Sequence, residues 1–466
     1  MITRTLVVSD LHLGSGGDFD TFAGAEALPA LLDKLGQTAI RVVLNGDTVD
    51  FLMNEDPLEL DPVRAVAQAA AIFAAPATRA VLHALGRIAA NGGEVVVRLG
   101  NHDIELALSE VQELFRKSLA QGPEVAARVR FERGDKPAIL EVGGARILIT
   151  HGEQNDVWNK VDYQNLPGPG AAEGVRPADF TYAPGSRLVK TLMNPLKKRY
   201  SMRFADLLKP DFQGATLTAL AVNPLAVKTI FQGSTVRLMW QLFRQSSGPT
   251  TFDPNNDERD LGLSRALERA GLSELEKEQL QALLSEDGAL SFAEGEDQSV
   301  LDKARLKLGQ AGLRAYARMQ KGLAADTGSR YFALTPAEDE WQEAQRLADK
   351  YGAQAVVLGH THAARFRSES SLTFVNTGTW IWLMRLPAPD ASDEDWATFL
   401  DSCRKNPRLD AHKPAAVPLI ERFTGALIDA KGPGASGATI SLFQWGPGGL
   451  EVLGQTDLGS VAGGHP

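Results

Sequence analysis

Cysteine is almost absent from this sequence, since Cys403 is the one cysteine in 466 residues. A single thiol can form neither an internal disulfide nor a cysteine-based zinc site, so we expect the chain to fold in a reducing compartment. The pattern of a signal peptide is also missing, because the apolar start of the chain runs directly into Asp10 and His12. These absences predict a cytoplasmic protein, and peripheral attachment at the inner membrane face is a further hypothesis.

An excess of basic residues and a long apolar run are missing as well. The chain has 58 acidic and 48 basic residues, and its net charge of −10 argues against a protein that coats nucleic acid along its whole surface. The most apolar stretch, residues 214–231, is interrupted by Asn223, Pro224 and Lys228, whereas a membrane span needs about 20 apolar residues. The hydrophobic share of 44% is typical of a globular protein, and the length favours two or three domains, or one with an insertion.

The chain does contain short apolar runs that end in polar residues. Strands are predicted at Thr5–Val8, Ile40–Leu44 and Glu94–Leu99, with helical stretches between them. Asp10, Asp47 and Asn101 follow these three runs closely. Ligands of open α/β sheets bind at the carboxyl ends of the strands, so these residues mark a candidate site.

The strand pattern stops near residue 155 and returns after residue 335. Before the gap, Gly143-Gly144 predicts a hairpin. After the gap we predict a helix from Thr335 to Tyr351 and strands at Ala355–Leu358, Leu372–Leu383 and about 438–452. We therefore predict an α/β core, residues 1–154 and 350–466, split by a long, mainly helical insertion, residues 155–349.

Five of the eight histidines follow predicted strands directly and lie beside Gly, Asp or Asn. They are His12, His102, His151, His360 and His362. One such histidine alone is usually a surface or core residue, because a motif as short as Asp-x-His has a high false-positive rate. Gly-Asn-His-Asp at residues 100–103 is much rarer, and the five motifs in this order are not a coincidence.

Together these motifs resemble the calcineurin-like metallophosphoesterase superfamily. The residues that carry the resemblance are Asp10-Leu11-His12, Gly46-Asp47-Thr48-Val49-Asp50, Gly100-Asn101-His102-Asp103, His151-Gly152-Glu153 and Gly359-His360-Thr361-His362. The resemblance implies a two-sheet β sandwich flanked by helices. It also implies a dinuclear metal-dependent phosphoesterase, in which metal-bound hydroxide attacks a phosphodiester or pyrophosphate bond.

One branch of the superfamily is closer than the others. Ser9–Gly14 and Phe51 resemble the branch that includes the UDP-2,3-diacylglucosamine pyrophosphohydrolases. That branch typically has Arg where this chain has His102, and its insertion is shorter. His102 is instead typical of the superfamily's nucleases, cyclic-nucleotide phosphodiesterases and protein phosphatases.

Hydrolysis of a phosphoester benefits from two metal ions about 3.5–4 Å apart, and these need a shared anionic ligand, for which Asp47 is well placed. The resemblance adds Asp10, His12 and His362 at the first ion. It adds Asn101, His151 and His360 at the second. Imidazole and carboxylate ligands suit Mn, Fe or Zn, and we expect Mn first.

The resemblance gives His102 a role other than metal binding. His102 would protonate the leaving oxygen or stabilise charge on the phosphoryl group, together with Asn101, and Asp103 would orient it. The alternative is a histidine that only shapes the loop. Asp50 and Glu153 are expected to support the site rather than to bind metal.

The insertion contains a basic segment, residues 186–245, with ten basic and two acidic residues. Apolar residues are interleaved with the basic ones, which suits an amphiphilic anion or a membrane surface. The alternative is a helical cap whose apolar face is simply core.

The main prediction is a phosphoesterase that acts on a phosphoester substrate. An amphiphilic substrate is a further hypothesis, based on the basic segment. A nuclease, whose basic segment would track a nucleic-acid backbone, and a phosphomonoesterase are alternative enzymes. A non-catalytic scaffold is a further alternative, although such relatives usually lose metal ligands and this chain has the whole set.

Overall fold

The structure is a computed structural model, and it describes residues 2–119, 122–156, 158–209, 222, 332–388, 391–409, 419–432 and 435–460. Contacts divide the chain into two units. The first unit comprises Met1–Arg187, Phe332–Trp382 and Glu421–Pro466, and the second comprises Leu188–Tyr331 and Leu383–Ile420. This division differs from the predicted limits, which stay a prediction: residues 155–187 and 332–349 group with the core, and residues 383–420 do not.

The first unit contains a seven-stranded sheet with the order β15-β14-β13-β1-β2-β3-β4. Its strands are β1 (Arg4–Val8), β2 (Arg41–Asn45), β3 (Glu94–Arg98), β4 (Val129–Glu132), β13 (Phe423–Ala430), β14 (Ala438–Gly446) and β15 (Gly449–Leu458). Strands β1 to β4 are parallel, and β13 pairs antiparallel with β1. The parallel arrangement brings the carboxyl ends of β1, β2 and β3 to one edge.

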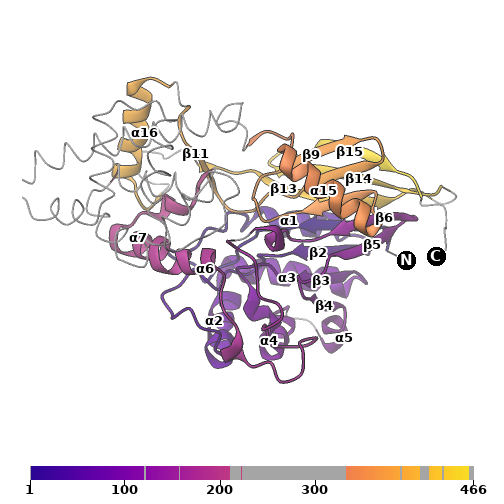
Figure 1. Ribbon diagram of the computed structural model, residues 1–466, viewed down its shortest axis with the longest axis horizontal. Helices are drawn as coiled ribbons and strands as arrows, with labels where there is room; N and C mark the ends of the chain where they lie inside the picture. Colours follow the sequence, from indigo (N-terminus) through magenta and orange to yellow (C-terminus); the bar gives the residue numbers. More distant parts are fainter. Residues whose placement is uncertain are drawn as a thin grey trace, which may run out of the picture. The chain divides into compact units, whose positions relative to one another are not determined.

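A five-stranded sheet has the order β5-β6-β8-β10-β9. Its strands are β5 (Ala138–Val142), β6 (Ala145–Ile149), β8 (Ala355–Leu358), β9 (Arg365–Glu369) and β10 (Leu372–Asn376). One buried cluster contains Val7 and Val43 from the first sheet and Ile147 and Val357 from the second. The two sheets therefore pack face to face as a sandwich (Figure 1), which confirms the predicted fold class.

Helices cover the outer faces of both sheets. The helices of the amino-terminal half are α1 (Ala27–Leu35), α2 (Pro62–Ala74), α3 (Pro76–Ala90), α4 (Ser109–Ser118) and the single turn α5 (Pro123–Ala126). Helix α15 (Glu338–Tyr351) packs Trp341 and Leu347 against Val356 and Phe374 of the five-stranded sheet. Short 3₁₀ turns occur at Ile104–Ala107, Glu153–Asn155 and Pro177–Asp179.

Among the described residues no single helix is long and apolar enough to span a membrane; by length and composition alone, the pair α2 and α3, bent by 85°, passes the same test.

The second unit is described only in part. It contains a π turn (Val189–Met193), α7 (Asn194–Tyr200), a 3₁₀ turn (Arg203–Asp206), α16 (Asp393–Lys405) and a small sheet of β7 (Leu208–Lys209), β11 (Leu383–Arg385) and β12 (Leu419–Ile420). Helix α6 (Pro184–Leu188) precedes the π turn. Of the predicted basic segment, residues 186–209 and 222 are described and the remainder lies outside the described residues.

Several element boundaries differ from the prediction. Helix α15 begins at Glu338 rather than Thr335, because Glu340 accepts the backbone N–H of Ala337 at 2.7 Å and so caps the helix there. The strand predicted at Leu372–Leu383 ends at Asn376. The single strand predicted at 438–452 is a hairpin that turns between Gly446 and Gly449.

Candidate metal centre

The loops after five strands carry the predicted site residues. They are Asp10 and His12 after β1, Asp47 after β2, Asn101 and His102 after β3, His151 after β6, and His360 and His362 after β8. Among the described residues eight non-glycine residues have positive φ, and five of them belong to this set: Asp10, His12, Asp47, His360 and His362. Residues other than glycine rarely adopt this left-handed backbone conformation, and those that do are concentrated at functional sites.

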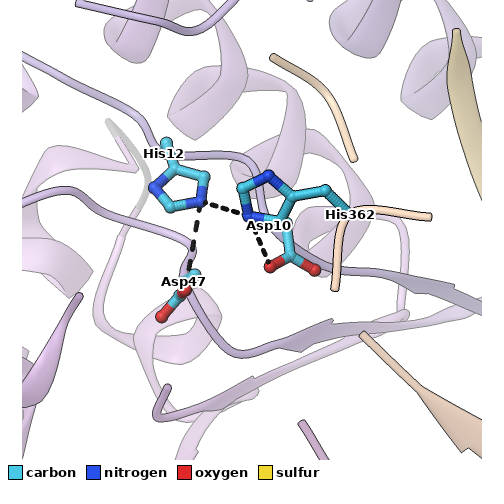
Figure 2. A group of neighbouring side chains, drawn as sticks. All are labelled: Asp10, His12, Asp47 and His362. Atoms are coloured by element: carbon cyan, nitrogen blue, oxygen red, sulfur yellow. Dashed lines mark hydrogen bonds and ion pairs between the residues drawn. The ribbon is translucent and has the colours of Figure 1, made fainter. Parts of the chain in front are cut away.

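The first group of converging side chains is Asp10, His12, Asp47 and His362 (Figure 2). The Nε2 atoms of His12 and His362 are 3.2 Å apart, and His362 Nε2 is 3.3 Å from Oδ1 of Asp10. Oδ2 of Asp47 lies 3.9 Å from His12 Nε2. Four donor atoms from three loops therefore face one small volume.

The second group is Asp47, His151 and His360. Oδ2 of Asp47 lies 3.3 Å from His151 Nε2. His151 Nδ1 is 2.8 Å from the carbonyl oxygen of Asn45, so its N–H points there and Nε2 is left to face Asp47. Asp47 thus belongs to both groups.

The donor atoms fit divalent metal ions. Donors that bind one ion at about 2.0–2.2 Å lie roughly 2.9–3.6 Å from each other, and three of the four distances above fall in that range. Four buried side-chain atoms of the predicted metal ligands also have no hydrogen-bond partner in the described part of the chain: Asp10 Oδ1, Asn101 Oδ1, His151 Nε2 and His360 Nδ1. Such atoms are costly unless something else binds them, and a cation would.

The charges of the group compensate one another. Burial raises the pKa of Asp10, but His151 and His362 beside it lower it more, to about 2. Burial also raises the pKa of Asp47, and His151 and His102 hold it well below its usual range. Burial lowers the pKa of His151, yet Asp47 and Asp10 raise it well above its ordinary value. A cation entering this group therefore has to displace protons.

His102 is placed differently from the histidines above. Its Nδ1 is 3.2 Å from Oδ2 of Asp50, which also lies 2.8 Å from Nδ1 of His12. Burial lowers the pKa of His102, but Asp50 and then Asp47 raise it to about 9. The Asp50 carboxylate thus orients the rings of both His12 and His102, and the Nε2 atom of each ring faces away from Asp50.

Asp103, expected to orient His102, makes its described hydrogen bonds to backbone amides. Its carboxylate accepts the backbone N–H groups of Thr48 and Gly100, each at 2.7 Å, and is fully buried. Burial and then Asp47 raise its pKa to about 7. Asp103 therefore ties the loop after β2 to the loop after β3, and the carboxylate that contacts His102 is Asp50.

Two glycines allow these loops to approach closely. A Cβ atom on Gly100 would lie 2.6 Å from the backbone nitrogen of Asp47, and one on Gly46, at φ +84°, would lie 2.3 Å from Cγ of His151. Both contacts are shorter than side-chain atoms tolerate, so the motif glycines are needed for space.

Sequence reasoning missed Asp156. Its Oδ2 lies 3.0 Å from Nε2 of His360. Burial raises the pKa of Asp156, but the hydrogen bond and charge of His360 lower it to about 2. The signal in the sequence is weak, since Asp156 is one acidic residue in a loop without a periodic pattern.

Comparisons with known proteins agree with the predicted resemblance. Residues 3–195 match the family model of the calcineurin-like phosphoesterases. A UDP-2,3-diacylglucosamine hydrolase of Bordetella pertussis (strain Tohama I) is 30% identical over 148 residues, which are 32% of this chain and 45% of that relative. The chain thus spans less than half the length of the curated relative it matches. The resemblance to the superfamily is confirmed, and the relative agrees with the predicted branch.

Proposed function

Residues 3–195 match the family model of the calcineurin-like phosphoesterases, and on that premise we propose that this chain is a metal-dependent phosphoester hydrolase. In the finer form of the proposal it uses two divalent ions to cut a phosphodiester or pyrophosphate bond. The observation that carries it is the position of Asp47, whose carboxylate belongs to both groups of converging donors.

Each donor has a part in the proposal. Asp10, His12 and His362 would hold one ion, Asn101, His151 and His360 the other, and Asp47 both. Two such ions make water acidic enough to attack phosphorus at neutral pH and neutralise charge on the phosphoryl oxygens. The mixture of imidazole and carboxylate favours Mn, with Fe or Zn as alternatives.

His102 supplies the proton. Asp50 holds its Nδ1 at 3.2 Å and keeps the ring charged. The side chain is 15% exposed, compared with 3% for His12, so its free edge is more open to a substrate. His102 therefore donates a proton to the leaving oxygen, and the Asn101 amide stabilises the phosphoryl group.

The substrate is proposed at a coarser level. The name of the Bordetella pertussis relative supports a nucleotide-linked lipid, whose cleaved bond would be a pyrophosphate. Most described apolar residues of the basic segment, among them Leu192, Leu196 and Phe204, are buried. Lys197 is also buried, whereas Lys198 and Arg199 are exposed. This part of the segment can therefore offer charge to an anion but little apolar surface.

Contact with a membrane or nucleic acid and a cytoplasmic location stay predictions.

A turnover panel tests the proposal. The full chain, loaded with Mn²⁺, Fe²⁺ or Zn²⁺, is assayed on bis-p-nitrophenyl phosphate, p-nitrophenyl phosphate, single- and double-stranded DNA and UDP-linked lipids. We expect metal-dependent turnover, fastest with Mn²⁺, on the diester or on the UDP-linked lipid. Activity on DNA or on the monoester alone would favour an alternative enzyme, and no turnover with any of the metals would contradict the proposal.

A double variant tests the amphiphilic substrate. Lys198→Glu with Arg199→Glu leaves the buried Lys197 in place. Each basic residue near an anionic surface contributes about 1 kcal/mol, so we expect weaker action on UDP-linked lipids and weaker binding to anionic vesicles. Hydrolysis of small esters should not change, and Lys136→Glu, an exposed lysine of the first unit, is the control. Wild-type behaviour on lipids, vesicles and DNA would contradict this part of the proposal.

A further inference from the structure

We propose that Asp156 is a positioning residue: it fixes His360 in the tautomer that presents Nδ1, and not Nε2, to the second metal ion. The inference rests on the proposed function, because it concerns how one of the assigned ligands is oriented. It follows from a contact between the loop after β6 and the loop after β8 that neither local sequence suggests.

The contact leaves one ring nitrogen for the metal. His360 Nε2 lies 3.0 Å from Oδ2 of Asp156, which can only accept a hydrogen bond when ionised. An imidazole that binds a metal ion is neutral and carries one N–H, so in that form the proton resides on Nε2 and the lone pair on Nδ1. Nδ1 of His360 is buried and has no hydrogen-bond partner. The ring is thus held with its unpaired donor inside the protein.

Asp156 is itself fixed without the help of His360. Its Oδ1 accepts the backbone N–H of Trp158 at 2.9 Å, and its Oδ2 accepts the side-chain amide of Asn159 at 2.7 Å. The loop is closed by the hydroxyl of Tyr163, which donates to Glu153 at 3.0 Å. The carboxylate is therefore held by contacts within its own loop in addition to its contact with the imidazole, as an orienting group must be.

The same loop contains a matched control. Asp162 accepts the side-chain amide of Asn165 at 2.8 Å, as Asp156 accepts that of Asn159, and it also accepts the backbone N–H of Asn165 at 3.4 Å. The described contacts of Asp162 include no histidine. Asp162→Ala thus removes contacts within the loop alone, and Asp156→Ala removes contacts within the loop and the contact with His360.

The first measurement is metal binding by calorimetry. Chelator-treated full chain is titrated with Mn²⁺ as wild type, Asp156→Ala, Asp156→Asn and Asp162→Ala. Loss of a carboxylate behind a metal-bound histidine typically weakens binding about 10–100-fold, so we expect that loss at one of two sites in Asp156→Ala. Asp156→Asn keeps one acceptor oxygen, which can still accept from His360 and Asn159 while the bond from Trp158 is lost. It should show a smaller loss, and Asp162→Ala none.

The second measurement reads the tautomer directly. Long-range ¹H–¹⁵N spectra of the metal-free wild type should show the His360 proton on Nε2, and the Asp156→Ala spectrum should show a mixture of tautomers. A merely structural role would not move this signal. Asp156→Leu, which has no acceptor atom, serves the same comparison if the alanine variant does not fold.

Two results would overturn the inference: equal metal binding in Asp156→Ala and Asp162→Ala, or a His360 tautomer that is the same with and without the Asp156 carboxylate. Neither readout uses turnover. A chain that binds two ions and responds to Asp156→Ala, but cleaves no phosphoester, would therefore refute the proposed function and leave this inference standing. A wild type that binds no second ion would refute both.

Discussion

Asp50 is the residue at which one substitution should disturb two histidines. Its Oδ2 lies 2.8 Å from His12 Nδ1 and 3.2 Å from His102 Nδ1, and its Oδ1 accepts the backbone N–H of Leu52 at 3.0 Å. Asp50→Asn can keep the bond from Leu52, but its NH₂ group then faces two ring nitrogens. Hydrogen bonds to charged groups contribute about 1.5–3 kcal/mol each, so we expect the free energy of unfolding of the metal-free protein to fall by about 3 kcal/mol at pH 6.

The loss should depend on pH, with a sign that follows from His102. Its pKa is about 9 in the folded protein, against about 6.5 in an unfolded chain. A raised pKa stabilises the protein fully below the unfolded value, and this stabilisation disappears as the pH rises through the folded value. The difference between wild type and Asp50→Asn should therefore be large at pH 6 and small at pH 10.

Urea denaturation of chelator-treated protein at both pH values measures this difference. The control is Asp33→Asn, whose ion pair with Arg87 at 2.8 Å is half exposed and should contribute less than about 1 kcal/mol. Mn²⁺ binding should also weaken about 10–100-fold in Asp50→Asn, because His12 loses its orienting acceptor. Equal destabilisation in both variants, or a loss that does not change between pH 6 and pH 10, would refute the reasoning.

Three further substitutions test the candidate centre. Asp47→Asn should lower the metal content of the purified protein, measured by mass spectrometry, because Asp47 is the donor shared by both groups; wild-type metal content would contradict that role. His102→Ala should keep its metal but lose about 10²–10⁴-fold in kcat, and a loss of metal would instead identify His102 as a ligand. Gly100→Ala should lower both Tm and metal content, because its Cβ would lie 2.6 Å from the Asp47 nitrogen, whereas Gly432→Ala, with no atom within 4 Å, should do neither.

The fold could be predicted where strands are continuous apolar runs. Thr5–Val8, Ile40–Leu44 and Ala355–Leu358 match β1, β2 and β8 to within one residue, because parallel strands are buried on both faces and leave few polar residues to blur the pattern. Strand β13 was missed although it pairs with β1. It contains Gly425, which the pattern treats as a break; in the structure a Cβ there would lie 2.9 Å from the Phe443 ring. The edge strand β9, with the sequence RFRSE, is polar enough to pass for a loop.

The sequence predicts which residues gather at the candidate site but not which of them contact one another. Each site residue follows the carboxyl end of a strand, so position along the chain was enough to select Asp10, Asp47 and His151, which follow strands of both sheets. Asp50 and Asp103 show why contacts are harder. Both belong to the motifs, yet Asp103 accepts from the backbone amides of Thr48 and Gly100, and Asp50 contacts two imidazoles. The direction of each carboxylate depends on the close approach of the loops after β2 and β3, whose contacting residues are 52 and 55 positions apart in the chain. Local sequence carries no information on that approach, and for the same reason Asp156 could be found only once the loop after β6 was seen against His360.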